Sequence, residues 1–182
     1  DDLALFSGAQ SDSTKAGKPF RWFTNELGRS TYAFNPLRQA FFSGLSLYQK
    51  TDVITTALGL QYGTDYGRGY FSDANAELLF HALKVRPDID SFRELEQVLG
   101  DRYALRGVSN QVLKDGSHIR TIVSRLAATE ALNVTPRDQV AETVQQQQIE
   151  FRDVFRTPQV VYLHLPSSLG TTSSAEIARI AL

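Results

Sequence analysis

The chain has 182 residues, of which 42% are hydrophobic and 21% are charged, and its formal net charge is -1. This length allows one medium domain with a sizeable core, or a domain that carries an inserted lobe. The balanced charge creates no overall field that would attract nucleic acid or a membrane, so any contact with a polyanion has to be a local basic patch. The sequence contains no cysteine, which excludes disulfides and zinc–thiolate sites.

No stretch of the sequence approaches the ~20 apolar residues that a membrane-spanning helix needs. The first residues do not have the pattern of a signal peptide. The chain contains no methionine, starts with Asp1 and stops within an amphipathic pattern over residues 177–182. We therefore expect it to be an internal part of a longer protein.

The first third of the chain predicts one helix followed by two short strands. Residues 1–15 have an acidic start and helical spacing of apolar residues, and Gly17 is a plausible stop. Residues 18–24 and 30–34 are β-prone and are separated by a turn, which predicts two strands of one sheet or a hairpin. Pro36 ends the second strand, because the residue before a proline avoids helical angles.

The middle of the chain predicts a run of helices. Residues 46–58 have helical spacing, and residues 59–71 alternate four glycines with three tyrosines, which indicates a loop. We expect helices over residues 72–151, and Ser72 or Asp73 is expected to cap the first one.

Three of these helices have specific end signals. Ser91 with Glu94 has the pattern of a capping box, and Gly100 should end that helix. Ser117 is expected to cap the next helix, which should end by Asn133. The apolar face of that helix consists of Ile119, Ile122, Val123, Leu126 and Ala127. A further helix is expected over residues 135–151, with a threonine cap and a proline in its first turn.

The end of the chain predicts a covered strand and then a helix. Residues 159–166 read Gln-Val-Val-Tyr-Leu-His-Leu-Pro, a short apolar run between Pro158 and Pro166. Such a run is typical of a strand inside an α/β sheet. Ser173 and Glu176 have the spacing of another capping box. Strands near both ends, with helices between them, indicate a sheet domain interrupted by an all-α insertion.

A phosphate-binding loop is not present. Such a loop needs G-x-x-x-x-G-K-[ST], but the only Gly-Lys pair, Gly17–Lys18, has Asp12 in place of the first glycine and Pro19 in place of the hydroxyl residue. The glycines of residues 63–69 have the wrong spacing, and turn geometry accounts for them.

No set of side chains has the pattern of a catalytic or metal site. Glu77 and His81 share a helix face, but one such pair needs further ligands to hold a metal. His118 is expected in a first helical turn and His164 on the strand as a satisfied core imidazole. A G-x-S-x-G nucleophile motif is absent. Four acids could be proposed as catalytic carboxylates, but they surround a helix start, where acids are electrostatically favoured: Asp88, Asp90, Glu94 and Glu96. We therefore assign no catalytic, cofactor-binding or metal-binding residues.

Basic residues of the helical lobe are the candidates for contacts with nucleic acid. Spread among acids, such residues usually form a solvated face, whereas a DNA-contacting surface would show a salt-dependent affinity. The five candidates are Arg102, Arg106, Lys114, Arg120 and Arg125.

Two segments resemble a known family. Residues 16–24, Ala-Gly-Lys-Pro-Phe-Arg-Trp-Phe-Thr, and residues 28–36, Gly-Arg-Ser-Thr-Tyr-Ala-Phe-Asn-Pro, are similar to the nucleotide-binding domain of type IV secretion coupling proteins, the TraD/TraG-like DNA-translocating ATPases of conjugation. In that family a helical domain is inserted after a strand ending in Asn-Pro, and a strand like residues 160–166 returns to the sheet. The resemblance implies an α/β fold with a partial RecA-like sheet, residues 1–71 and 152–182, and an inserted all-α domain, residues 72–151.

The resemblance also implies properties of a parent protein. The family's phosphate loop lies upstream of this stretch and its acidic strand-end motif lies downstream, so the chain itself is expected to be inactive. The parent would bind ATP and Mg²⁺ as a homo-hexamer anchored on the cytoplasmic face of the inner membrane. This segment would be cytoplasmic, with no membrane contact of its own. Its helical lobe would engage DNA and relaxase or other relaxosome proteins.

Two other functions are open from the sequence. The chain could be a helical adaptor that docks a partner protein through an exposed apolar groove and binds no nucleic acid. A small stand-alone enzyme is disfavoured, because no nucleophile–base pair or ligand set appears.

Overall fold

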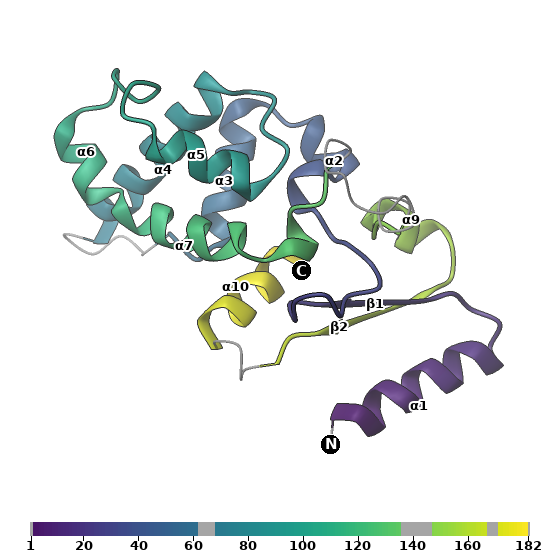
Figure 1. Ribbon diagram of the computed structural model, residues 1–182. Helices are drawn as coiled ribbons and strands as arrows, with labels where there is room; N and C mark the ends of the chain where they lie inside the picture. The colour runs from purple at the N-terminus through teal and green to yellow at the C-terminus, as the bar shows by residue number, and fades with distance from the viewer. Residues whose placement is uncertain (1, 62–67, 136–146, 167–170, 182) are drawn as a thin grey trace.

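The structure is a computed structural model, and it describes residues 2–61, 68–135, 147–166 and 171–181. A two-stranded sheet lies between a single helix on one side and a group of helices on the other (Figure 1). The described elements are α1 (Asp2–Lys15), β1 (Phe20–Thr24), η1 (Pro36–Arg38), α2 (Ala40–Ser43), α3 (Leu47–Ala57), α4 (Arg68–Val85), α5 (Phe92–Gly100), α6 (Asn110–Asp115), α7 (Ser117–Ala127), η2 (Glu130–Leu132), α9 (Phe151–Arg156), β2 (Val160–His164) and α10 (Thr171–Ala181).

The two strands pair in parallel although they lie near opposite ends of the sequence. The register runs from Phe20 opposite Val160 to Thr24 opposite His164. Parallel neighbours need a long crossover connection, and here that connection contains all the helices from α2 to α9. The predicted α/β fold, with a helical body inserted between two strands of one sheet, is confirmed.

Helix α1 covers one face of the sheet through an aromatic cluster. The ring of Phe6 contacts Phe20, Trp22 and Tyr162, with centroid separations of 5.5, 4.9 and 5.7 Å. Edge-on and tilted contacts of this kind are the favoured arrangements of aromatic rings. Both strands thus contribute to the surface on which α1 packs.

Helix α1 ends at Lys15, just before the glycine that the sequence predicts as its stop. Gly17 has φ 63°, the left-handed region. The backbone N–H of Gly17 donates to the carbonyl oxygen of Thr14 (3.0 Å), and that of Lys18 donates to the carbonyl oxygen of Ser13 (2.9 Å). This pair of bonds is a Schellman motif, in which glycine avoids the steric cost of a side chain.

The helical body is built from amphipathic helices. Helix α5 packs against α7, and α4 packs against α3, α5, α6 and α7. All five apolar residues predicted for α7 are buried. So are Phe92, Leu95, Val98 and Leu99 of α5. The buried core continues without interruption to Phe23 of β1 and Ile177 of α10, and each fully buried side chain of this size contributes about 1.5–3 kcal/mol.

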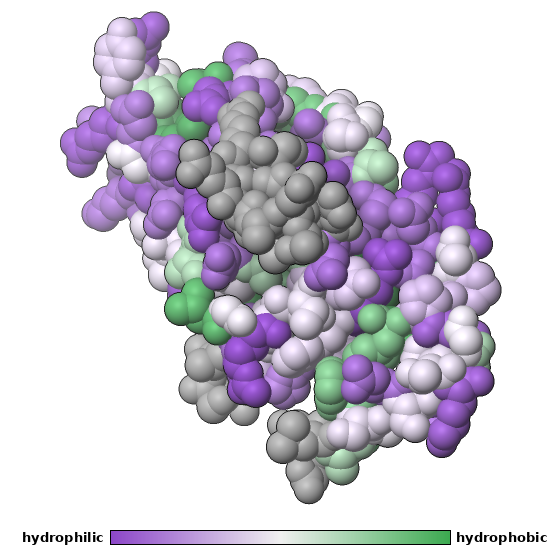
Figure 2. All heavy atoms as spheres, turned by 45° about the vertical axis from the view of Figure 1, so that its right-hand side comes forward, coloured by the Kyte–Doolittle hydropathy of each residue, from purple (hydrophilic) through white to green (hydrophobic). Residues whose placement is uncertain are grey.

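The boundaries expected for the inserted domain, residues 72–151, remain a prediction. Helix α3 precedes residue 72 and packs against α4, and α10 follows residue 151 and packs against α3 and α7. Among the described helices, none combines the length and apolar character that a membrane crossing requires. One face of the molecule is mostly polar, with apolar residues in separate small groups (Figure 2).

The prediction of a second strand over residues 30–34 is wrong. This segment returns beside β1 with one backbone hydrogen bond, from the N–H of Tyr32 to the carbonyl oxygen of Trp22 (3.0 Å). Ala33 then forms an isolated bridge with Gln148. Hydroxyl side chains replace ladder bonds here: the N–H of Thr24 donates to Ser30 Oγ at 3.0 Å. Local side-chain bonding of this kind competes with a regular ladder.

Two helix starts and the extent of one further helix also differ from expectation. Helix α4 already begins at Arg68, so Ser72 and Asp73 lie inside it. Helix α7 begins at Ser117 itself, and its N-cap position, Gly116, provides no side-chain cap. The helix expected from residue 135 does not extend to 151, since residues 147–150 are not helical and α9 begins at Phe151; residues 136–146 lie outside the described residues.

Candidate functional site

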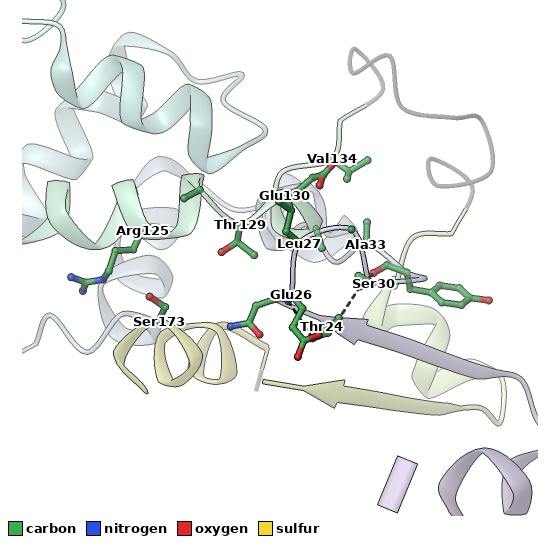
Figure 3. A pocket seen from close by; sticks show the side chains of 15 residues that line it. Thr24, Glu26, Leu27, Ser30, Ala33, Arg125, Thr129, Glu130, Val134 and Ser173 are labelled. Carbon is green, nitrogen blue, oxygen red and sulfur yellow. Dashed lines mark hydrogen bonds between the residues drawn. The ribbon is translucent and has the colours of Figure 1, made fainter. Parts of the chain in front are cut away.

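A cleft of about 490 Å³ opens at the carboxyl end of β1 (Figure 3). Its walls are the turn after β1, the end of α7 with η2, and the start of α10. This edge is where ligands bind in open parallel α/β sheets.

Hydrogen bonds to side-chain hydroxyls fix the turn after β1. Ser30 Oγ accepts the N–H of Thr24 (3.0 Å) and donates to the carbonyl oxygen of Tyr32 (2.6 Å). The N–H of Glu26 donates to Thr24 Oγ1 at 3.3 Å. Gly28 has φ 67°, which completes the reversal. The hydroxyl groups of Thr24 and Ser30 are therefore bonded within the turn itself.

Arg125, which lines the cleft, forms a bidentate ion pair with Glu176. Arg125 Nε donates to Glu176 Oε2 at 3.2 Å, and Arg125 Nη2 donates to Glu176 Oε1. The Glu176 side chain is 4% exposed and that of Arg125 is 33% exposed. The hydrogen bond to Glu176 raises the pKa of the Arg125 guanidinium, and the negative charge of the carboxylate acts in the same direction. Two parallel charge-assisted bonds of this kind are strong and directional.

This ion pair overturns the capping box expected at Ser173 and Glu176. Helix α10 begins at Thr171, and the carboxylate of Glu176 contacts α7 and not its own helix start. Ser174 Oγ donates to the carbonyl oxygen of Pro166 (3.1 Å) and accepts from Asn25 Nδ2 (3.3 Å). These contacts join α10 to both strands' carboxyl ends.

The charge of the cleft does not suit a polyphosphate. Of the described residues that line it, Glu26 and Glu130 are acidic and Arg125 is the one cation. Arg29, which follows in the turn, pairs with Glu26 at 2.5 Å. In Figure 3 the guanidinium of Arg125 points away from Thr24 and Glu26. Polyphosphates need basic side chains or free backbone N–H groups, so the cleft offers a poor match for them.

The five basic candidates occupy different environments. Arg102 and Arg106, in the connection between α5 and α6, are exposed, and so is Lys114 on α6. Arg120 on α7 is half-buried, and its Nε has no hydrogen-bond partner among the described residues. Arg125 is held by Glu176. Arg102, Arg106 and Lys114 are thus exposed to a ligand, whereas Arg120 is half-buried and Arg125 would have to leave Glu176.

The sequence patterns did not predict two features of the surface. Tyr103 is 76% exposed, and the guanidinium of Arg106 lies 4.9 Å from its ring centroid. A hollow of about 670 Å³ contains Phe41 and Phe155, which are 56% and 88% exposed. A basic residue on each side of an aromatic signals the first feature. The second joins residues far apart in sequence, and no local pattern marks it.

Comparison with known proteins gives one structural similarity. No protein-family model matches the sequence, and no curated protein matches it. Among solved structures, the chain is similar to a conjugative coupling protein, the class that the sequence resembles. That structure is the bacterial conjugative coupling protein TrwBdeltaN70, in a trigonal form in complex with sulphate. The TM-score is 0.48 at 16% sequence identity, and the match covers 91% of this chain and 44% of that chain. The chain therefore spans less than half the length of that protein.

Proposed function

We propose that this chain is the substrate-engaging segment of a conjugative coupling ATPase, which delivers DNA to a type IV secretion system. The observation that supports this role is the parallel pairing of β1 with β2 around a crossover that consists of a helical body. This is the layout implied by the sequence resemblance: a strand, an inserted helical domain and a returning strand.

In this proposal the chemistry of ATP belongs to other parts of the parent. The chain has no phosphate loop, and its cleft is lined by Glu26 and Glu130. ATP and Mg²⁺ would be held outside this segment, in a homo-hexamer at the inner membrane. The helical body would contact the transported DNA or the relaxase attached to it.

We assign the contact with DNA to the exposed residues among the five basic candidates. Arg102, Arg106 and Lys114 are exposed on the α5–α6 side of the helical body. The net charge of -1 means that these local groups have to provide the attraction. Arg125 is left out of this set, because freeing its guanidinium would leave the buried carboxylate of Glu176 without a partner.

A binding titration tests the proposal. Fluorescence anisotropy of labelled single- and double-stranded DNA is measured with the wild-type chain and with a triple variant, Arg102→Ala, Arg106→Ala and Lys114→Ala. We expect the triple variant to lose most of the DNA affinity. A control of equal charge change, Arg38→Ala, Arg152→Ala and Arg156→Ala, removes three exposed arginines elsewhere and should keep it. Absence of binding by the wild type to DNA of either kind and to a relaxase would refute the proposal.

The apolar hollow supports the adaptor function as a second candidate. Phe41 and Phe155 expose large aromatic surface beside Phe34, Phe151 and Ile180. Exposed apolar surface of this kind often marks a protein-binding site. The adaptor function predicts that Phe41→Asp with Phe155→Asp abolishes capture of a relaxase, and that the wild type shows no salt-dependent DNA binding. Retained capture by this double variant would exclude the hollow as the docking site.

A further inference from the structure

We infer that Tyr103, with Arg106, forms a stacking site for an unpaired base of single-stranded DNA. This inference rests on the proposed function and adds to it the form of the nucleic acid and the side chain that reads it. Arg102, Arg106 and Lys114 alone would attract phosphates of any DNA, whereas an exposed aromatic ring can distinguish unpaired bases from paired ones.

Buried side chains and hydrogen bonds hold the turn that carries Tyr103. Leu105 and Val108 are 1% and 7% exposed and anchor the turn in the core of the helical body. Asp101 Oδ1 accepts the N–H of Tyr103 at 2.8 Å. The backbone N–H of Leu105 also donates to the carbonyl oxygen of Asp101 (3.1 Å). Because the backbone is held in place, ordering it on binding costs little entropy.

Outside this anchored turn, an aromatic ring and two cations face the solvent. Tyr103 is 76% exposed, and Arg106 Cζ lies 4.9 Å from its ring centroid. The guanidinium of Arg106 packs on one face of the Tyr103 ring, so its positive charge lies next to the ring. Arg102, which precedes Tyr103 in the sequence, adds a second exposed positive charge. A base can stack on the ring while the adjacent phosphates contact the guanidinium groups, which is the arrangement that single-strand binders use.

A second exposed tyrosine provides a contrast within the same chain. Tyr48 is also 76% exposed, but its ring packs on Phe80 at 4.8 Å and lines a groove with Asp52, Asp73 and Glu77. The acidic groove repels phosphates, so equal exposure does not make Tyr48 a stacking site. The connection between α5 and α6, in contrast, lies at the end of the helical body away from the sheet (Figure 1).

The test compares Tyr103→Ala with Tyr48→Ala in the full chain. Binding of a labelled oligothymidine and of a duplex is measured over a range of salt. We expect Tyr103→Ala to bind the oligothymidine about tenfold more weakly, within the range known for loss of one stacked base. Duplex affinity and the salt dependence should not change, because no charge is removed. Tyr48→Ala should bind both DNAs like the wild type, and Tyr103→Phe should keep the single-strand affinity. Photo-crosslinking with an iododeoxyuridine oligonucleotide should label Tyr103.

The outcomes separate the inference from the proposed function. Wild-type binding of the oligothymidine with no loss in Tyr103→Ala would overturn the stacking site and leave the proposed function standing. An equal loss for the duplex, or a loss of relaxase capture with oligothymidine binding unchanged, would also overturn it, the latter in favour of a protein partner. Failure of the wild type to bind any DNA would refute the proposed DNA contact and this inference together.

Discussion

Arg125 and Glu176 form an ion pair, and we expect the loss of Arg125 to destabilise the fold more than the loss of Glu176. It joins α7 of the helical body to α10, which follows β2. Arg125→Ala leaves a carboxylate that is 4% exposed without its bidentate partner, whereas Glu176→Ala leaves a guanidinium that is 33% exposed and can still reach water. The first change should therefore cost more free energy of unfolding than the second.

The magnitudes follow from this difference in burial. Loss of one partner of a buried ion pair costs about 3–5 kcal/mol. Because this pair is partly open to water at Arg125, we expect Arg125→Ala to cost about 3 kcal/mol of unfolding free energy, the lower end of that range. For Glu176→Ala we expect about 1–2 kcal/mol, the cost of a partly hydrated unpaired group. The double variant should be less destabilised than the sum of the two, with a coupling of about 1–3 kcal/mol.

Urea unfolding followed by the fluorescence of Trp22, the single tryptophan, provides the assay. Trp22 lies on β1, so it reports on the sheet while the substitutions lie on the helices beside it. Exposed Ser124→Ala on α7 is the matched control, and surface changes of that kind stay within about 0.5 kcal/mol. Equal and additive losses for Arg125→Ala and Glu176→Ala would refute the argument that burial of the carboxylate determines the cost.

Three further predictions concern other contacts of the helical body. Gly116→Ala should cost about 2 kcal/mol in urea unfolding, because a Cβ there would lie 2.8 Å from a carbonyl oxygen of α4, whereas Gly107→Ala, with open space around it, should be nearly neutral. Asn133→Ala should cost about 2–3 kcal/mol, because its buried amide donates to three carbonyl oxygens at the end of α7; a cost below that of an exposed substitution would contradict this role. The hydrogen bond to Asp115 (2.8 Å) raises the pKa of the Tyr70 phenol, so Tyr70→Phe should remove a late step from the alkaline absorbance titration. The stabilising effect of that bond is present below the unfolded pKa of about 10 and is lost as the pH rises through the folded pKa; an unchanged titration would contradict it.

Local patterns predicted those parts of the fold that local physics determines. The apolar run of β2 and the aromatic run of β1 both form strands, and the face predicted for α7 is buried. Ser91 caps α5 as expected, since its Oγ accepts the N–H of Glu94 at 3.2 Å. In each case the residues that determine the local structure lie close together in the sequence.

The failures involve partners that lie far away in the sequence. Glu176 has the spacing of a capping residue, yet a guanidinium 51 positions away on α7 takes its carboxylate. The same contact pairs the guanidinium of Arg125 with Glu176, which the sequence around Arg125 does not indicate. Residues 30–34 are β-prone, but the hydroxyl of Ser30 and the bridge from Ala33 to Gln148 take the bonds that a hairpin would use.

The salt dependence of single-stranded DNA binding tests the proposed role most directly. Each phosphate neutralised by a side chain contributes about -0.7 to the slope of log affinity against log salt for single strands, so contacts from Arg102, Arg106 and Lys114 predict a slope of about -2. Removing all three charges should bring the slope close to zero. A slope near zero for the wild-type chain, or no measurable binding at low salt, would contradict the account.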